Sequence, residues 1–214
     1  IDMIAKGLKK FREEPKVDPE NIQVLFEITL NNLKSHGDID EQDFLDRADI
    51  LCSIGQTVLI SNYQKYYKLV EFFSRHTKKR MGVIMGASTL VDIFDEKYYR
   101  NLSGGILEAF GKLFYRDLKV YMYPYHDQAS DTYINSENLK VHPRVKELYK
   151  FFKNNGKLVN IDDFDPEILD IFSRTVLKMV RDGENGWEAM LPKGIPEIIK
   201  QKRLFGYSKA RENK

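Results

Sequence analysis

The sequence has very little cysteine, since Cys52 is the only one among 214 residues. A single thiol cannot form an internal disulfide, so a small secreted scaffold held by disulfides is excluded. The cysteine and the histidines also show no spacing of the kind that zinc sites require, and we predict no metal site. Low cysteine content is typical of a reducing compartment, and we therefore expect a cytoplasmic location.

Long hydrophobic runs are missing as well. The longest apolar stretches have about five to seven residues, whereas a membrane-spanning helix needs roughly twenty. No signal peptide is visible, so the sequence predicts no association with a membrane. The chain begins with Ile1 rather than Met, and we expect a fragment or processed product whose partners include an upstream domain of the same protein.

An excess of one charge is also absent, because 34 lysines and arginines face 32 acidic residues and the net charge is +2. Such a balance provides no general attraction to nucleic acid, and we predict no nucleic-acid partner. The glycine-rich phosphate-binding motifs of dinucleotide-binding proteins and P-loop enzymes do not occur either. The sequence therefore names no cofactor, and it identifies no catalytic residue.

What the chain does contain is a regular alternation of short apolar runs and stretches with helical spacing. The elements are predicted in the order strand 57–60, helix 63–76, strand 81–85, helices 89–99 and 106–115, and strand 118–123. The β-branched run at 57–60 is typical of a buried strand, and we expect residues 81–85 to form a central, fully buried strand. This order predicts an α/β fold, a Rossmann-like parallel sheet with crossover helices and a helical C-terminal extension.

Three regions follow from this pattern: N-terminal helices over 1–55, the parallel-sheet core over 56–142, and a helical segment over 143–214 that packs on the core through Trp187. Asp18, Pro19 and Glu20 form a helix-start pattern, and apolar residues then follow helical spacing until Gly37. A second helix is predicted from 40 to 54. Residues 125–142 are predicted to form a long polar loop.

The candidate binding residues stand where the predicted strands end. In an open parallel sheet, ligands bind outside the carboxyl ends of the strands. The polar or small residues at these ends are Ser61, Asn62, Gly86, Ser88, Thr89 and His126. We predict that they line one crevice that binds a small-molecule or nucleotide-like ligand.

Each of these residues also has a simpler interpretation. Ser88 or Thr89 could serve as a helix N-cap, Asn62 could cap the helix after the first strand, and Gly86 could be a turn glycine. His126 next to Asp127 could act as a general acid or base, because histidine titrates near neutral pH. A histidine in a loop, however, is usually only solvated.

Several segments resemble a family of larger bacterial proteins of uncharacterised function. The similar segments are "VLISNYQKYYKLVEFF", "MGASTLVDIFDEKYY", "GGILEAFGKLF" and "KRLFGY". The resemblance runs from about residue 40 through nearly the whole remaining chain and corresponds to the C-terminal part of those proteins. Their inconsistent labels include TonB-dependent receptor and nicotinate-nucleotide adenylyltransferase. The resemblance implies a parallel sheet and a bacterial cytoplasmic origin, and it transfers no catalytic residue.

A second, shorter resemblance concerns "TVLISN", which is similar to a strand motif of haloacid-dehalogenase-type phosphatases. Those enzymes also need an Asp-x-Asp nucleophile after an earlier strand, and "GDIDEQD" has these letters but follows a predicted helix. Two hypotheses on function therefore stand. The first is a domain of a larger enzyme that binds a small anionic or nucleotide-like ligand. The second is a non-catalytic interaction or scaffold module, which the 12 tyrosines favour.

Overall fold

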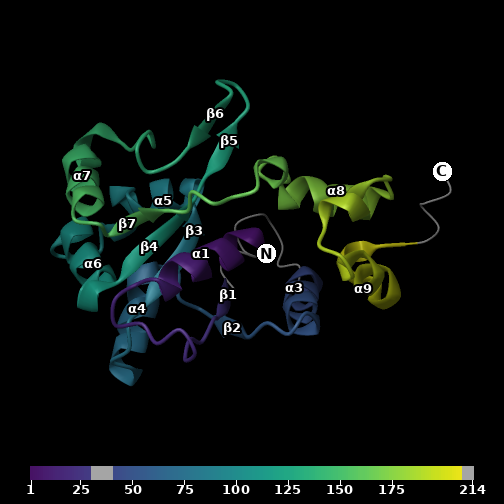
Figure 1. Ribbon diagram of the computed structural model, residues 1–214, viewed down its shortest axis with the longest axis horizontal. Coiled ribbons are helices and arrows are strands. Elements are labelled where there is room, and N and C mark those ends of the chain that lie inside the picture. Colours follow the sequence, from purple (N-terminus) through teal and green to yellow (C-terminus); the bar gives the residue numbers. More distant parts are fainter. Residues whose placement is uncertain (30–40, 209–214) are drawn as a thin grey trace. The chain divides into compact units, whose positions relative to one another are not determined.

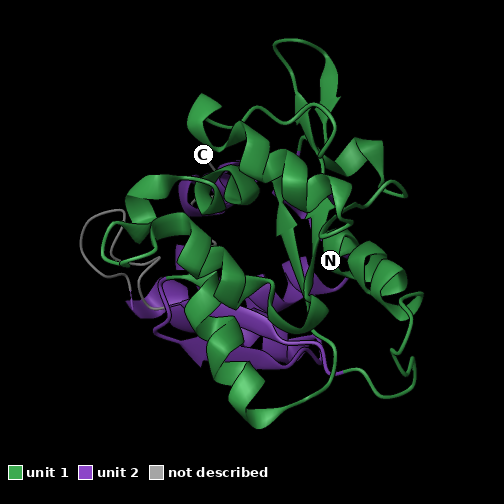
Figure 2. Ribbon diagram, turned by 90° about the vertical axis from the view of Figure 1, so that its left-hand side faces the viewer, with its two compact units in different colours: residues 1–22, 65–170 green, residues 23–64, 171–214 purple. Residues whose placement is uncertain are grey.

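A computed structural model of the chain describes residues 1–29 and 41–208 (Figure 1). These residues form a mixed fold of helices and strands with a small open parallel sheet. They divide into two compact units (Figure 2), unit 1 with residues 1–22 and 65–170, and unit 2 with residues 23–64 and 171–214. The division does not coincide with the expected regions 1–55, 56–142 and 143–214, because each unit combines two stretches that are far apart in the sequence.

Unit 1 holds most of the regular structure. Its elements are α1 (Asp2–Arg12), α4 (Tyr66–His76), β3 (Gly82–Gly86), α5 (Ala87–Ile93), α6 (Gly105–Leu113), β4 (Lys119–Tyr123), β5 (Tyr125–Asp127), β6 (Thr132–Ile134), α7 (Lys146–Asn154) and β7 (Leu158–Asn160). The order of strands and helices predicted between residues 63 and 123 is confirmed.

The sheet of unit 1 is parallel and has the strand order β3-β4-β7. Its central strand is β4, in which Val120, Tyr121 and Met122 are at most 1% exposed. The prediction of a central, fully buried strand at 81–85 is wrong. Among the described strands β3 pairs only with β4, and Met85 is its one fully buried residue. The reason is that β2, which was expected beside β3, pairs with β1 instead, whereas the three-residue strand β7 pairs with the other edge of β4.

Helices cover both faces of this sheet. Alternate side chains of β4, such as Val120 and Met122, face a core that α4, α5, α6 and α7 also supply. The other face carries α1, which lies across β3 and β4 in Figure 1. Gly7 allows this close approach, because a Cβ atom there would stand 2.6 Å from the Ile84 side chain. The face of α1 that contains Gly7 thus packs directly on β3 and β4.

The region predicted as a polar loop contains a hairpin. Strands β5 and β6 pair antiparallel with His126 opposite Tyr133, directly after the end of β4. Tyr125 and Tyr133 remain 38% and 43% exposed. Three residues per strand give too short an alternation of polar and apolar side chains to be recognised in the sequence.

Unit 2 combines a two-stranded parallel sheet with helices. Its elements are β1 (Phe26–Thr29), α3 (Glu41–Ser53), β2 (Val58–Ser61), α8 (Ser173–Asp182) and α9 (Ile195–Lys202). Its core contains Trp187, Val180 and Ile199, against which Ile50 of α3 packs. The C-terminal segment that was expected to pack on the parallel sheet thus shares a core with α3.

The N-terminal part of the chain differs from its prediction. The helix expected after Asp18 is wrong in its described part, because Phe26–Thr29 is a strand that pairs with β2. Leu33 and Gly37, which completed that pattern, lie outside the described residues. The helix predicted at 40–54 is confirmed as α3, but Leu45 is 56% exposed and Asp46 is 2% exposed. Asp46 is buried because its carboxylate accepts hydrogen bonds from Gln42 and from the backbone N–H of Phe205.

Of the helices in residues 1–29 and 41–208, none combines the length and the apolar character that crossing a membrane requires.

Candidate functional site

The six predicted binding residues are distributed over both units. Ser61 and Asn62 belong to unit 2, whereas Gly86, Ser88, Thr89 and His126 belong to unit 1. The reason is that β2 pairs with β1 and not with β3 in the described residues. The expectation that one sheet carries all of these strand ends is therefore wrong, and the candidate site is described for unit 1 alone.

Ser61 has a structural role in unit 2. Its hydroxyl donates a hydrogen bond to the Glu27 carboxylate on the neighbouring strand at 2.5 Å and accepts one from the backbone N–H of Tyr63 at 3.1 Å. The residue is 8% exposed. Asn62 follows in an exposed position. Ser61 thus connects β1 with β2, and its hydroxyl is already engaged at the end of the strand.

The carboxyl end of β3 has an open arrangement. Gly86 is the last residue of β3 and also the N-cap of α5, so the helix begins with no intervening loop. Apart from its two chain neighbours, no described residue has an atom within 4 Å of the position that a Cβ atom would take at Gly86. Because Gly86 is opposite Tyr123 in the sheet, the carboxyl ends of β3 and β4 lie at the same edge.

Ser88 and Thr89 lie inside α5, and the interpretation of either as its N-cap is wrong. Ser88 is exposed and Thr89 is half-buried. The hydroxyl groups of both residues have no hydrogen-bond partner among the described residues. Together with the open space at Gly86, they offer two hydrogen-bonding groups at the edge where a ligand of a parallel sheet is expected.

His126 is held between two carboxylates. Its Nε2 atom lies 3.0 Å from Asp131 Oδ1, and its Nδ1 atom lies 3.1 Å from Asp170 Oδ1. The side chain is 18% exposed, and its ring lies 5.2 Å from the ring of Tyr133. Hydrogen bonds to Asp131 and then to Asp170 raise the pKa of His126 above its ordinary value. Both ring nitrogens donate only when the ring is charged, so the geometry favours the imidazolium form.

The neighbouring Asp127 has different partners. Its carboxylate accepts hydrogen bonds from the backbone N–H of Ala129 and from the hydroxyl of Ser130. Asp127 therefore stabilises the turn of the hairpin, and His126 links this hairpin to Asp170. The pair suggested by the sequence as a general acid or base does not act together in this structure, because each side chain is engaged elsewhere.

We expect His126 to make the stability of unit 1 depend on pH. A group whose pKa is raised in the folded state contributes its stability in full below the unfolded value of about 6.5, and loses it as the pH rises through the folded value. The melting temperature of the wild type should therefore fall more between about pH 6 and pH 8.5 than that of His126→Gln. Differential scanning fluorimetry at a series of pH values measures this difference.

The control for this prediction is His76→Gln, at an exposed histidine with no carboxylate partner among the described residues. This variant should keep the pH dependence of the wild type. Equal slopes for the wild type and His126→Gln would contradict a charged His126 in the folded state.

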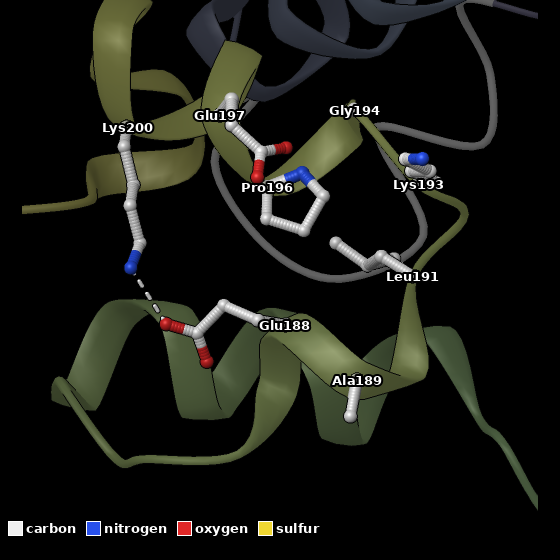
Figure 3. A pocket seen from close by; sticks show the side chains of 8 residues that line it. All are labelled: Glu188, Ala189, Leu191, Lys193, Gly194, Pro196, Glu197 and Lys200. Carbon is white, nitrogen blue, oxygen red and sulfur yellow. Dashed lines mark hydrogen bonds and ion pairs between the residues drawn. The ribbon is translucent and has the colours of Figure 1, made fainter.

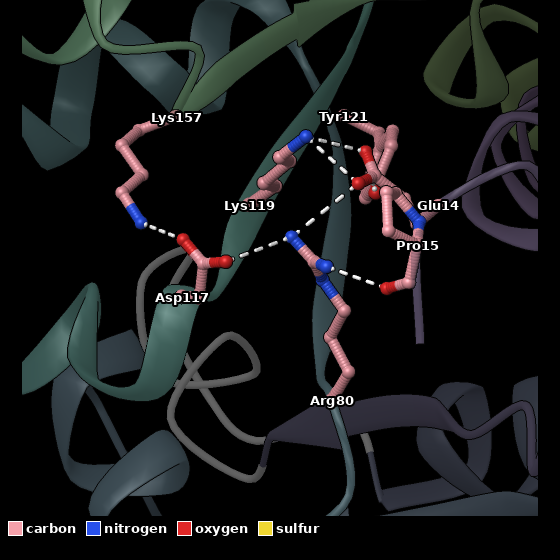
Figure 4. A network of polar contacts seen from close by, with 7 residues as sticks. All are labelled: Glu14, Pro15, Arg80, Asp117, Lys119, Tyr121 and Lys157. Carbon is pink, nitrogen blue, oxygen red and sulfur yellow. Dashed lines mark hydrogen bonds and ion pairs between the residues drawn. The ribbon is translucent and has the colours of Figure 1, made fainter. Parts of the chain in front are cut away.

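A second polar cluster lies at the opposite edge of the sheet, and Figure 4 shows it. Arg80, Lys119 and Lys157 stand at or just before the first residues of β3, β4 and β7. The carboxylate of Glu14 accepts hydrogen bonds from Lys119 at 2.7 and 2.8 Å and from the Tyr121 hydroxyl at 3.0 Å. This amino-edge network joins the segment after α1 to the starts of the strands.

Arg80 extends the amino-edge network in two directions. An Nη atom of Arg80 lies 3.3 Å from Glu14 and 3.1 Å from Asp117, and its other Nη atom donates to the backbone carbonyl of Pro15 at 2.8 Å. Asp117 also pairs with Lys157. The Nε atom of Arg80 is buried without a hydrogen-bond partner among the described residues.

Burial alone would raise the pKa of Glu14, but the hydrogen bonds from Lys119 and Tyr121 together with Arg80 hold it below its ordinary value. Burial and the hydrogen bond to Glu14 raise the pKa of Tyr121, so its hydroxyl stays protonated. The network is thus a set of charges that satisfy one another. It is suited to holding the sheet together, and it presents no nucleophile.

The carboxyl edge of the sheet carries charges of both signs. In the segment after β7, Lys6 and Lys9 pair with Asp163, Lys10 pairs with Asp162, and Asp165 lies nearby. Asp131 and Asp170 add two more carboxylates, on either side of His126, whose raised pKa favours its cationic form. Most of the acidic groups at this edge therefore already have a cationic partner.

Sequence analysis missed the amino-edge network. A cation stands beside the start of each strand, which is a detectable pattern, but the partner Glu14 is 105 residues away from Lys119 in the chain. Within residues 1–29 and 41–208 no three histidine, cysteine or acidic side chains are grouped so that they could hold a metal ion. Comparison with family models, with curated proteins and with solved structures gives no match in any of the three cases.

Proposed function

We propose that unit 1 is a Rossmann-like domain that binds a small anionic or nucleotide-like ligand at the carboxyl ends of β3 and β4. The observation that carries the proposal is the open space at Gly86, where β3 runs directly into α5. Ser88 and Thr89 add hydroxyl groups beside this space. Ligands of open parallel sheets bind at this edge because the loops and helices that follow the strands converge there.

The charges and the sequence motifs at this edge restrict the class of ligand that could bind there. The phosphate-binding glycine motifs are absent from the sequence, and the lysines at this edge are already paired with aspartates, so no cluster of cations is left to bind a di- or triphosphate among the described residues. A molecule with one anionic group, such as a carboxylate or a nucleoside monophosphate, fits these constraints best. We assign no catalytic step, because both ring nitrogens of His126 are engaged with carboxylates.

The variant Gly86→Ala tests the site, because it adds a single methyl group there. Gly86 has φ −76° and ψ 160°, a conformation that alanine adopts without strain, and the new Cβ would contact no described residue beyond its chain neighbours. Gly86→Ala should cost only about 0.5–1 kcal/mol through the N-cap position. The methyl group would nevertheless occupy the proposed ligand space, so we expect at least about a tenfold loss of affinity, which corresponds to 1.4 kcal/mol.

The measurement is a thermal-shift screen of carboxylic acids, sugar phosphates and nucleoside monophosphates, followed by titration of any ligand found. Gly111→Ala is the matched control, because Gly111 lies in α6 and an added Cβ there would also meet no described residue outside its own helix within 4 Å. It should bind as the wild type does. A flat response over the whole screen, or a Gly86→Ala variant with unchanged affinity, would refute the proposed site.

The second candidate function is a protein-interaction module. It is favoured by the exposed Tyr125 and Tyr133 on the hairpin, since tyrosine is enriched at interfaces. This function predicts that the thermal-shift screen stays flat and that Tyr125→Ser, at the other exposed tyrosine of the hairpin, leaves the stability of unit 1 nearly unchanged. Ligand binding that depends on Gly86 would favour the first proposal instead.

A further inference from the structure

Unit 2 contains a cavity of about 350 Å³ between the 3-10 helix Trp187–Met190 and α9 (Figure 3). Its volume lies in the range of small-molecule sites. The wall has an unusual composition, because two glutamates and two lysines share it with the apolar residues Leu191 and Pro196. The cavity belongs to unit 2 alone and is separate from the site proposed in unit 1.

Two of the four charged residues are already paired. Lys200 donates to Glu188 at 2.7 Å, and its ammonium group lies 5.5 Å from the centre of the Trp187 ring. The hydrogen bond from Lys200 holds the pKa of Glu188 below its ordinary value, although burial opposes this. These contacts fix one side of the cavity as a neutral ion pair.

The other two charged residues have no such partners. Among the residues that the structure describes, the side chains of Lys193 and Glu197 make no hydrogen bond or ion pair. Both residues are exposed and line the same cavity. Gly194 between them has φ +89°, and apart from its two chain neighbours no described residue has an atom within 4 Å of its potential Cβ position. One ammonium group and one carboxylate are therefore both available to a molecule in this cavity.

We propose that this cavity binds a free amino acid with a small apolar side chain. Its carboxylate would accept a hydrogen bond from Lys193, and its ammonium group would donate to Glu197. The side chain would lie against Leu191 and Pro196, which Figure 3 shows between the Glu188–Lys200 pair and Lys193. A ligand with one charge would satisfy only one of the two unpaired groups, and a neutral ligand would satisfy neither.

The test uses L-leucine as the probe and measures binding by isothermal titration calorimetry on the whole chain. Two analogues remove one charge each, namely 4-methylpentanoate without the ammonium group and 3-methylbutylamine without the carboxylate. Each should bind at least about tenfold more weakly than leucine, which corresponds to the loss of one ion pair of 1.4 kcal/mol. A panel of the other apolar amino acids then defines the preferred side chain.

Lys193→Gln and Glu197→Gln should each weaken leucine binding by about tenfold and should leave the melting temperature unchanged, since both side chains are exposed. Lys178→Gln and Glu184→Gln are matched controls on exposed positions of the same unit, and both should bind leucine as the wild type does. The proposal would be overturned if no apolar amino acid bound at millimolar concentration. Equal affinity for leucine and its two analogues would overturn it as well. Neither result bears on the site at Gly86.

Discussion

Replacement of Val120 by aspartate is expected to unfold unit 1. Val120 is 0% exposed in the central strand β4, and its side chain lies in the core that the helices α4 to α7 share. An aspartate there would bury a charge with no partner. Such a change costs about 4 kcal/mol or more, a large part of the 5–15 kcal/mol by which domains are stable. Circular dichroism during urea unfolding measures the loss, and low soluble yield would agree with it.

The control for Val120→Asp is Val91→Asp, the same change on a residue of α5 that is 36% exposed. Its aspartate can reach water, so the free energy of unfolding should change by well under 1 kcal/mol beyond helix propensity. Val83→Asp on the half-buried strand β3 should fall between the two. A soluble Val120→Asp variant with the wild-type urea midpoint would show that β4 is not the centre of the sheet.

Replacement of Glu14 by glutamine should destabilise unit 1 by about 2 kcal/mol at neutral pH, because it leaves Lys119 and Arg80 without their shared carboxylate. Loss of one partner of a buried ion pair costs about 3–5 kcal/mol, but glutamine still accepts a hydrogen bond. The expected destabilisation is therefore below that range. Urea unfolding monitored by fluorescence gives the free energy directly.

The pH dependence of Glu14→Gln separates the loss of charge from a loss of packing. Because the pKa of Glu14 is lowered in the folded state, its contribution is present above the unfolded value of about 4.3 and is lost as the pH falls through the folded value. The difference from the wild type should thus shrink in acid. Glu13→Gln, on the exposed neighbouring residue, should show no such effect. A difference that stayed constant down to about pH 2 would contradict the ionic role.

Much of the local structure follows from the sequence. The helices α3, α4 and α6 lie where apolar spacing predicts them, and β3 and β4 coincide with short apolar runs. These elements are recognisable because each one buries a face whose period is a property of the segment itself. For the same reason, Gly86, Ser88 and Thr89 could be placed at the end of a strand before the fold was known.

Strand pairing could not be obtained in this way. The run at 57–60 is a strand as predicted, but it pairs with Phe26–Thr29, whose letters fit helical spacing equally well. Strand β7 has only the three residues 158–160. They form a strand because their backbone groups pair with those of β4. Which strands are neighbours depends on hydrogen bonds between distant segments, and no local pattern records them.

For the charged residues as well, the sequence shows which groups are present, and only the fold shows which groups are in contact. The sequence alone determined that His126 and Asp127 are adjacent and that basic and acidic residues are nearly balanced, 34 to 32. Only the tertiary structure placed Asp131 and Asp170 on the two ring nitrogens, and brought Glu14 to Lys119 across 105 residues. A side chain's ionisation and role depend on the burial and partners that folding supplies. The sequence therefore determined the elements whose apolar period is their own, and the packing of the chain decided the short strands and which residues meet.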